Sequence, residues 1–290
     1  MMFMEWYIFA IMAAVLSGLV PSINKKILNN MPALEFSTFF SLINAVLVLP
    51  IAFLVSFDIP LKILALLFAG SLFGVMGFLY VSKALKIFPV SVVSPLTNIN
   101  PAVLLILAVF ILGEKPTITQ VIGITTIIIG AYIIESKRHP CEILSSIKIE
   151  KTSVLYITFL SATFYAFSSV IDKTVLKAIT PLQYILIAHL FIASIFSFIV
   201  LAKTPDLKKL EPDFKKSFRW ILLASVMTVA YRLMQAQAVS MTFVSLVIPI
   251  KHMNSLISTA VGGTLFHEKD LGKKMFACAI MLIGAYLVIA

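Results

Sequence analysis

The chain has 290 residues, of which 60% are hydrophobic and 12% are charged, and its formal net charge is +10. In soluble proteins about a quarter of the residues are charged, so this composition excludes a soluble protein and leaves little sequence for a soluble catalytic domain. A basic excess can also indicate nucleic-acid binding, but here most basic residues lie in loops between apolar segments. We therefore expect an integral membrane protein.

The apolar segments are long and continuous, as a membrane-spanning helix of about 20 residues requires. Strands of a membrane barrel would be shorter and would alternate between apolar and polar residues. Glu5 stands where a cleaved signal peptide would be basic, so the first segment is interpreted as a helix. The expected fold class is an all-α integral membrane protein, with ten transmembrane helices at 4–23, 33–56, 62–83, 89–112, 117–135, 153–172, 181–202, 218–239, 242–266 and 271–289.

The distribution of basic residues predicts the orientation in the membrane. Seventeen of the 23 basic residues follow the first, third, fifth, seventh and ninth expected helices, and four lie on the opposite side. The remaining two, Arg232 and Lys251, lie inside helices. Loops rich in Lys and Arg stay in the cytoplasm. We therefore expect a multi-pass protein of the plasma membrane with both termini outside.

The second half of the chain repeats the first. Asn24-Lys25 matches Asp172-Lys173 at a separation of 148 residues, and Pro95 matches Pro249 at a separation of 154. This pattern predicts a first five-helix repeat at 1–135, a cytoplasmic linker at 136–152 and a second repeat at 153–290. Because five is an odd number, the repeats would be inverted relative to each other, as in many secondary transporters.

The repeated motifs resemble a known family. Asn100-Pro101, LGEK at 112–115 and the closing IIIGAYII, with HEK at 267–269 and MLIGAYLV at 281–288, resemble EamA-type repeats of the drug/metabolite transporter superfamily. The resemblance implies a ten-helix transporter of small metabolites that hydrolyses no nucleotide. Its cavity would be lined mainly by helices 1, 3, 4, 6, 8 and 9.

The chain departs from the family pattern in three respects. Ser255 stands where the first repeat has Pro101, and Ala277 stands where it has Gly123, so the second copy is expected to pack differently in detail. Ten-helix members often have cytoplasmic termini, whereas the charge distribution here predicts the opposite orientation.

In the repeated Glu-Lys turns, we interpret Glu114 as a residue that favours the positive end of the helix that follows it, with a gating contact as the alternative.

Ionisable side chains inside the membrane are costly and therefore mark candidate functional sites. Lys251 follows Pro249 by two residues, and the proline opens a gap in the hydrogen bonding of its helix. Lys251 and Arg232 could instead extend to the membrane interface, and the His and Asn residues could serve only to hydrogen-bond between helices. The expected substrate-binding residues are Lys251, Arg232, His252, Asn98, Asn254, Gln235, Tyr80 and Tyr165.

The charges of these residues predict the substrate class. Glu5 and Asp172 lie near the ends of expected helices, so no carboxylate is expected inside a span. Two embedded cations favour a substrate with a carboxylate or phosphate. Thr97 and Asn98 match Lys251 and His252 in the repeat, and this asymmetry favours a specific substrate. We expect a secondary transporter, exporter or exchanger, that moves an anionic or zwitterionic metabolite by alternating access.

Two alternatives stay open: an amino-acid or drug exporter with another charge preference, and a membrane-embedded protein that does not transport. Against an enzyme, the chain lacks HExxH, GxSxG and paired intramembrane carboxylates. We expect no catalytic residue, cofactor, metal or nucleic-acid partner. The expected partners are a small-molecule substrate and the lipid bilayer. A coupling ion, H+ or Na+, an exchanged substrate, and a homodimer through Gly262-Gly263 are left open.

Overall fold

The computed structural model describes residues 6–87, 93, 97, 99–135, 150–203, 211–254 and 271–289. All the regular elements in these residues are helical, and each of the ten expected ranges contains a helix. The all-α fold class is therefore confirmed. Within the described residues, four helical segments are long and apolar enough to cross a membrane, namely Trp6–Leu28, Ala33–Phe53, Leu61–Ile87 and Pro181–Lys203.

The first repeat has its expected order, with one break. Its elements are α1 (Trp6–Ser17), α2 (Val20–Leu28), α3 (Ala33–Val48) with the 3-10 helix η1 (Leu49–Phe53), α4 (Leu61–Ile87), α6 (Asn100–Leu112) and α7 (Ile118–Glu135). The first span, expected to be continuous over 4–23, is divided into α1 and α2. Pro21 lies in the first turn of α2, where its missing N–H is tolerated. Residues 88–92, 94–96 and 98 lie outside the described part.

The second repeat consists of α9 (Glu150–Val175), α10 (Pro181–Lys203), α11 (Glu211–Met241), α12 (Val244–Lys251) and α14 (Leu271–Ile289). Helix α11 extends beyond the expected 218–239 at both ends, and its first turns carry the charged residues of the preceding polar stretch. The ninth expected helix is represented by α12, and residues 255–270 lie outside the described part.

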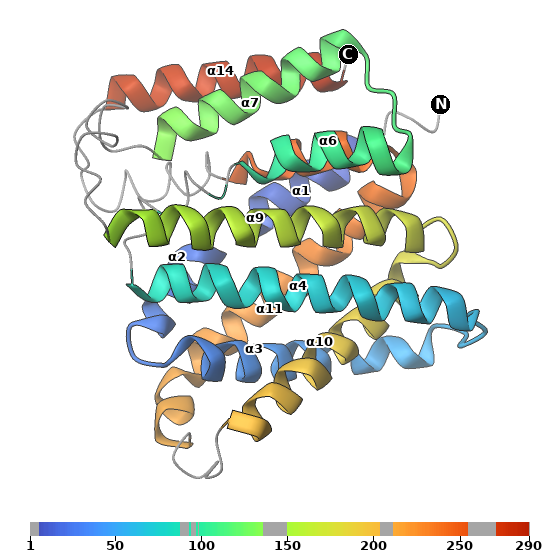
Figure 1. Cartoon of the computed structure of the whole chain (residues 1–290), viewed down its shortest axis with the longest axis vertical. Coiled ribbons are helices and arrows are strands. Elements are labelled where there is room, and N and C mark those ends of the chain that lie inside the picture. Colours follow the sequence, from blue (N-terminus) through green and yellow to red (C-terminus); the bar gives the residue numbers. More distant parts are fainter. Residues whose placement is uncertain are drawn as a thin grey trace.

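The long helices lie side by side, and the two repeats run in opposite directions (Figure 1). The start of α1 and the end of α14 lie at one end of the bundle, here called the terminal end. The end of α7 and the start of α9 lie at the opposite end, here called the linker end. Helices α2 and α4 finish at the linker end, whereas α9 and α11 finish at the terminal end.

The main helix pairs combine the two repeats. Helix α4 packs along α9, α1 along α11, and α7 along α14. A Cβ atom at Gly123 would lie 2.7 Å from the carbonyl oxygen of Gly284, and one at Gly284 would lie 2.8 Å from that of Gly123. In the matching pair, a Cβ atom at Gly130 would lie 3.1 Å from the Ala277 carbonyl. The α7–α14 contact thus contains two matched close approaches, and the helices are slightly farther apart where Ala277 replaces a glycine.

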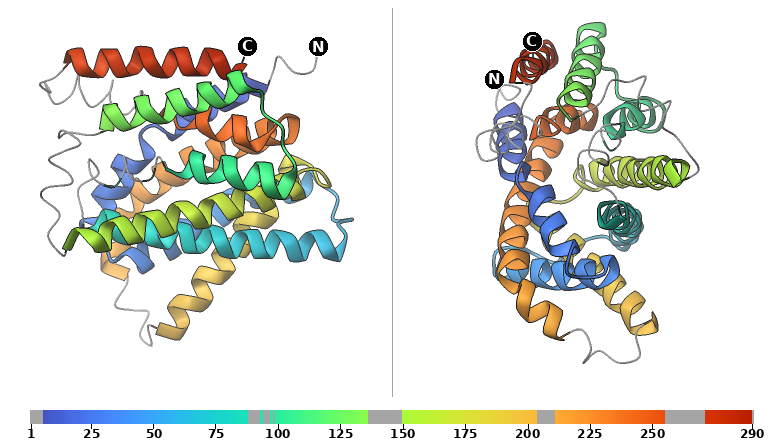
Figure 2. Two further views of the ribbon diagram at one scale, coloured as in Figure 1. Left: turned by 45° about the horizontal axis from the view of Figure 1, so that its top comes forward. Right: turned by 90° about the vertical axis from the view of Figure 1, so that its left-hand side faces the viewer.

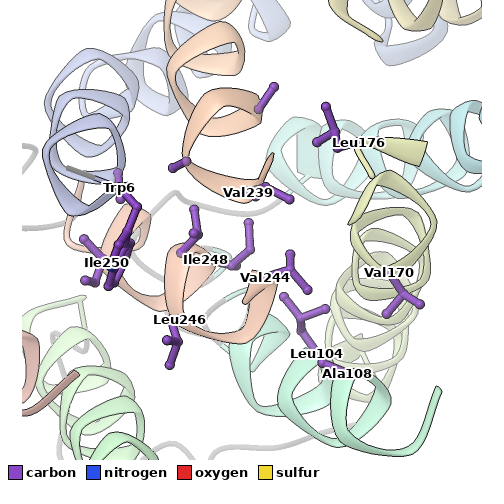
Figure 3. Close-up of a cluster of buried hydrophobic side chains, with 14 of the residues drawn as sticks. Trp6, Leu104, Ala108, Val170, Leu176, Val239, Val244, Leu246, Ile248 and Ile250 are labelled. Carbon is purple, nitrogen blue, oxygen red and sulfur yellow. The ribbon is translucent and has the colours of Figure 1, made fainter. Parts of the chain in front are cut away.

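Helix α12 is enclosed by protein. Every residue from Val244 to Ile250 is buried. Figure 3 shows the α12 residues Leu246 and Ile248 in one apolar cluster with Trp6 of α1 and Leu104 of α6. The end of α12, where Lys251 stands, is therefore held in the interior of the bundle.

Candidate functional site

A cavity of about 270 Å³ lies inside the bundle. One wall is formed by α4 and α9, and the facing wall by α2 and α11 (Figure 2, right). Residues of α3, α6, α10 and α12, together with Thr97, complete the described lining. The volume is close to the lower end of the range for small-molecule sites, roughly 300–1,000 Å³. All six helices that the family resemblance implied contribute, and α3 and α10 also contribute.

Lys251, the last residue of α12, lines this cavity. Its ammonium nitrogen lies 5.4 Å from the centre of the Tyr231 ring on α11, within the range of a cation–π contact. The neighbouring His252 also lines the cavity. Because α12 is buried along its length, Lys251 faces the cavity, whereas a lysine in a lipid-facing helix could extend to the membrane interface.

Arg232, in the second half of α11, lines the same cavity. Its Nη2 atom donates a hydrogen bond to the hydroxyl oxygen of Tyr184 on α10, at 3.2 Å. Asp172 of α9, Tyr184 and Arg232 also line one small pocket together. The guanidinium of one wall and the carboxylate of the other therefore lie near the same tyrosine.

The expectation that no carboxylate lies inside a span is wrong for Asp172. This residue lies near the end of α9, as the sequence indicated, but it is only 9% exposed and lines the cavity. Ser161, Tyr165 and Ser168 of α9 line the cavity as well. With Asp172 they follow the spacing of one helix face, and this spacing was the signal in the sequence that could have identified the carboxylate.

The structure places the predicted site residues in two groups. Lys251, Arg232, His252, Gln235 and Tyr165 line the cavity together. Tyr80 and Asn254 are not among its described lining residues, and the Tyr80 ring stacks on Phe164 at a centroid distance of 5.8 Å. Asn98 lies outside the described part of the chain.

Sequence reasoning missed several further polar residues of the cavity as site residues, among them Tyr184, His189 and Asn100. Tyr184 and His189 come from α10, a helix that was not expected to contribute. The Nδ1 atom of His189 lies 2.8 Å from the Ile185 carbonyl oxygen of its own helix. Asn100 donates a hydrogen bond to the Ala162 carbonyl at 2.8 Å, which is the interhelical role considered for the asparagines.

The two repeats contribute matching positions to the cavity but different chemistry. Phe78 matches Arg232, and Thr97 matches Lys251, at the separation of 154 residues. Ser41 matches His189 at the separation of 148. All the charged residues among the described lining therefore come from the second repeat.

The Glu114 turn supports the site from outside. Gly113 ends α6 in the left-handed region, at φ 66°, and Glu114 is only 4% exposed. The Glu114 carboxylate accepts hydrogen bonds from the backbone N–H groups of Val244, at 2.8 Å, and Ser245, at 3.1 Å, and from the Ser245 hydroxyl. The interpretation that Glu114 favours the following helix is wrong, because its side chain caps α12, whose first N–H groups lack helical partners.

Comparisons with known proteins identify the family. The model of the EamA-like transporter family matches residues 4–136 and 152–290. Among solved structures, 28 chains match. One of them, described only as the crystal structure of a protein, shares 14% identity at a TM-score of 0.74 and covers 99% of this chain and 98% of its own. That likeness shows a shared fold. No curated protein matches the sequence.

Proposed function

The chain belongs to the EamA-like transporter family, and from this premise we propose that it is a secondary transporter, exporter or exchanger, of an anionic or zwitterionic metabolite. In this proposal the protein lies in the plasma membrane with both termini outside. Residues 1–135 and 153–290 are its two repeats, joined by a cytoplasmic linker. It works by alternating access, with H+, Na+ or an exchanged substrate as the coupling partner.

The charge of the cavity supports this substrate class. The described lining contains two cations, Arg232 and Lys251, and one carboxylate, Asp172, so the formal charge is positive by one. Arg232 donates a hydrogen bond to Tyr184 and lines one small pocket with Asp172. The Lys251 ammonium lies over the Tyr231 ring and donates no hydrogen bond to any described residue, so it can donate to a further group. A carboxylate or phosphate of the substrate would provide that partner.

Asp172 supports one alternative within transport. A zwitterion could place its carboxylate against Lys251 and its ammonium against Asp172, which would make the protein an exporter of amino-acid-like molecules. Replacing the carboxylate by an amide, Asp172→Asn, separates the two cases. Binding of zwitterions should weaken about tenfold or more, whereas binding of simple anions should stay the same or become tighter.

The experiment that tests the proposal is the thermal stability of the detergent-solubilised protein with a panel of carboxylates, phosphates, zwitterions and organic cations. A ligand at about 100 times its Kd stabilises the folded state by about 2.7 kcal/mol. We expect stabilisation by anions or zwitterions, and its loss in Lys251→Gln.

The matched control is Lys83→Gln, because Lys83 is exposed on α4 and is not among the described lining residues. This variant should keep the full response. Stabilisation by cations that is unchanged in Lys251→Gln would contradict the proposal and would favour a drug exporter.

A further inference from the structure

Two lysines join helix ends at opposite ends of the bundle. The Lys25 ammonium, on α2, donates a hydrogen bond to the Leu85 carbonyl near the end of α4. The Lys173 ammonium, on α9, donates to the carbonyls of Val239, at 2.7 Å, and Thr242, at 2.6 Å, where α11 ends. The first contact lies at the linker end and the second at the terminal end.

The two contacts are images of each other in the duplication. Lys25 and Lys173 are matched at the separation of 148 residues, and Leu85 and Val239 at the separation of 154. The last carbonyls of a helix have no partner within the helix and carry its negative end. An ammonium group suits both needs, and each lysine binds carbonyls at such a helix end.

Both contacts connect the same two helix pairs across the cavity. Lys25 stands on α2, which continues from α1 and lies in the wall with α11, and it reaches α4 in the opposite wall. Lys173 stands on α9, in the wall with α4, and it reaches α11. The cavity lies between these contacts, which therefore close its two ends.

Each wall is joined internally by contacts of its own. In the α4–α9 wall, the hydroxyl of Ser161 donates to the Gly77 carbonyl at 2.8 Å, and that of Ser168 to the Gly70 carbonyl at 3.0 Å. In the other wall, the Lys26 ammonium of α2 lies 3.7 Å from the centre of the Trp220 ring of α11. Motion of one wall against the other would leave these contacts intact while it separates one lysine from its carbonyls.

A second contact strengthens the closure at each end. At the linker end, Lys86 of α4 donates to the carbonyls of Leu28, at 2.6 Å, and Met31, at 3.2 Å. At the terminal end, Glu114 caps the start of α12 directly after the α11 residues that Lys173 binds. Each end is thus closed by two charged side chains, one of which belongs to the matched lysine pair.

We propose that Lys25 and Lys173 are a symmetry-related pair of latches for alternating access. Release of Lys25 opens the cavity toward the linker end, and release of Lys173 opens it toward the terminal end. This inference rests on alternating access in the proposed function, but it is independent of the substrate class.

The test uses one cysteine in the cavity and a thiol reagent that does not cross membranes. Ser71→Cys is a suitable reporter, because Ser71 lines the cavity and its buried hydroxyl has no hydrogen-bond partner in the described structure. The background carries Cys141→Ser and Cys278→Ala. Labelling rates are measured from outside on intact cells and from the cytoplasmic side on inverted vesicles, without substrate.

The two latch variants should act on opposite faces. Loss of a hydrogen bond from a charged group changes an equilibrium by roughly tenfold or more. Lys25→Gln should therefore raise labelling severalfold or more from one face, the cytoplasmic face by the charge distribution, and Lys173→Gln should raise it from the other. The controls Lys83→Gln and Lys177→Gln replace exposed lysines near the same ends and should leave both rates unchanged.

Arginine variants test whether a donor at each position restores closure, and a second variant at the linker end replaces Lys25→Gln if that protein does not fold. Lys25→Arg and Lys173→Arg retain a donor and should return labelling toward the parent rate. If Lys25→Gln does not fold, as judged by size-exclusion chromatography, Lys86→Gln breaks the same end and should show the same sidedness. Labelling that rises from one and the same face in both variants, or that matches the controls, would overturn the latches. Ligand stabilisation through Lys251 would be unaffected by that result, so the two proposals fail separately.

Discussion

The two repeats have similar residues at the α7–α14 contact and different residues in the cavity. At the contact, matching positions keep small residues, because Gly130 matches Gly284 and Gly123 matches Ala277. In the cavity, matching positions differ in charge, as with Phe78 and Arg232. Close backbone approach requires the same property on both sides of the contact, whereas a binding site has no such requirement. The two repeats are therefore alike at the helix contact and at the proposed latch lysines, and they differ in the proposed substrate site.

The largest effect should come from breaking the symmetric contact. In Gly284→Val the new Cβ atom would lie 2.8 Å from the Gly123 carbonyl, and its methyl groups would force α7 and α14 apart. We expect a loss of about 3 kcal/mol or more in the free energy of unfolding, measured as the unfolding midpoint in detergent. Gly74→Ala is the control, because its nearest neighbour is the Ser168 hydroxyl at 3.4 Å. Equal midpoints for the two variants would contradict the account.

A smaller effect is expected where the charges of the second repeat meet. Arg232→Gln removes the donor to Tyr184 and leaves Asp172 without its cation. Hydrogen bonds to charged groups contribute about 1.5–3 kcal/mol, so we expect a loss of about 2 kcal/mol. The double variant Arg232→Gln, Asp172→Asn should recover part of it. Simple additivity of the two changes in a double-mutant cycle would show that the two groups are not coupled.

Glu114 belongs to a motif that both repeats share, but it holds α12, which carries Lys251 of the asymmetric cavity. Glu114→Gln weakens the hydrogen bonds from Val244 and Ser245 and removes the negative charge beside the start of α12. We expect a loss of about 1 kcal/mol in unfolding free energy and weaker binding of anions, because α12 positions Lys251. Glu35→Gln serves as the control, because Glu35 lies in the first turn of α3 and is not among the described lining residues, and this change should not affect anion binding. Unchanged binding in Glu114→Gln would contradict the positioning role.

The smallest effect is expected at Tyr80, which the sequence placed in the site. Tyr80→Phe keeps the ring that stacks on Phe164, and Tyr80 is not among the described residues of the cavity lining. We expect a change within about 0.5 kcal/mol in stability and no change in ligand-induced stabilisation. A loss of ligand-induced stabilisation in this variant would show that Tyr80 contributes to binding.

Much of the fold follows from local sequence, because apolar length and repeated glycines act along one chain segment. The ten helical ranges and the matched endings at Gly130 and Gly284 could be recognised in this way. The break before α2 was missed although Pro21 indicates it. The cavity could not be predicted from single segments, because its geometry depends on contacts such as the capping of α12 by Glu114, which joins segments 130 residues apart. Asp172 was assigned to a helix end by its position, whereas the face of α9 directs it inward.

The central claim is that a cation of the second repeat binds an anionic group of the substrate. The most direct measurement is counterflow uptake in proteoliposomes of the anion that gives the largest thermal stabilisation, compared between the parent protein, Lys251→Gln and Lys83→Gln. The account predicts a loss of about tenfold or more in uptake for Lys251→Gln, as expected when a charge-assisted contact is removed, and no loss for Lys83→Gln. Equal uptake by all three proteins would contradict the claim.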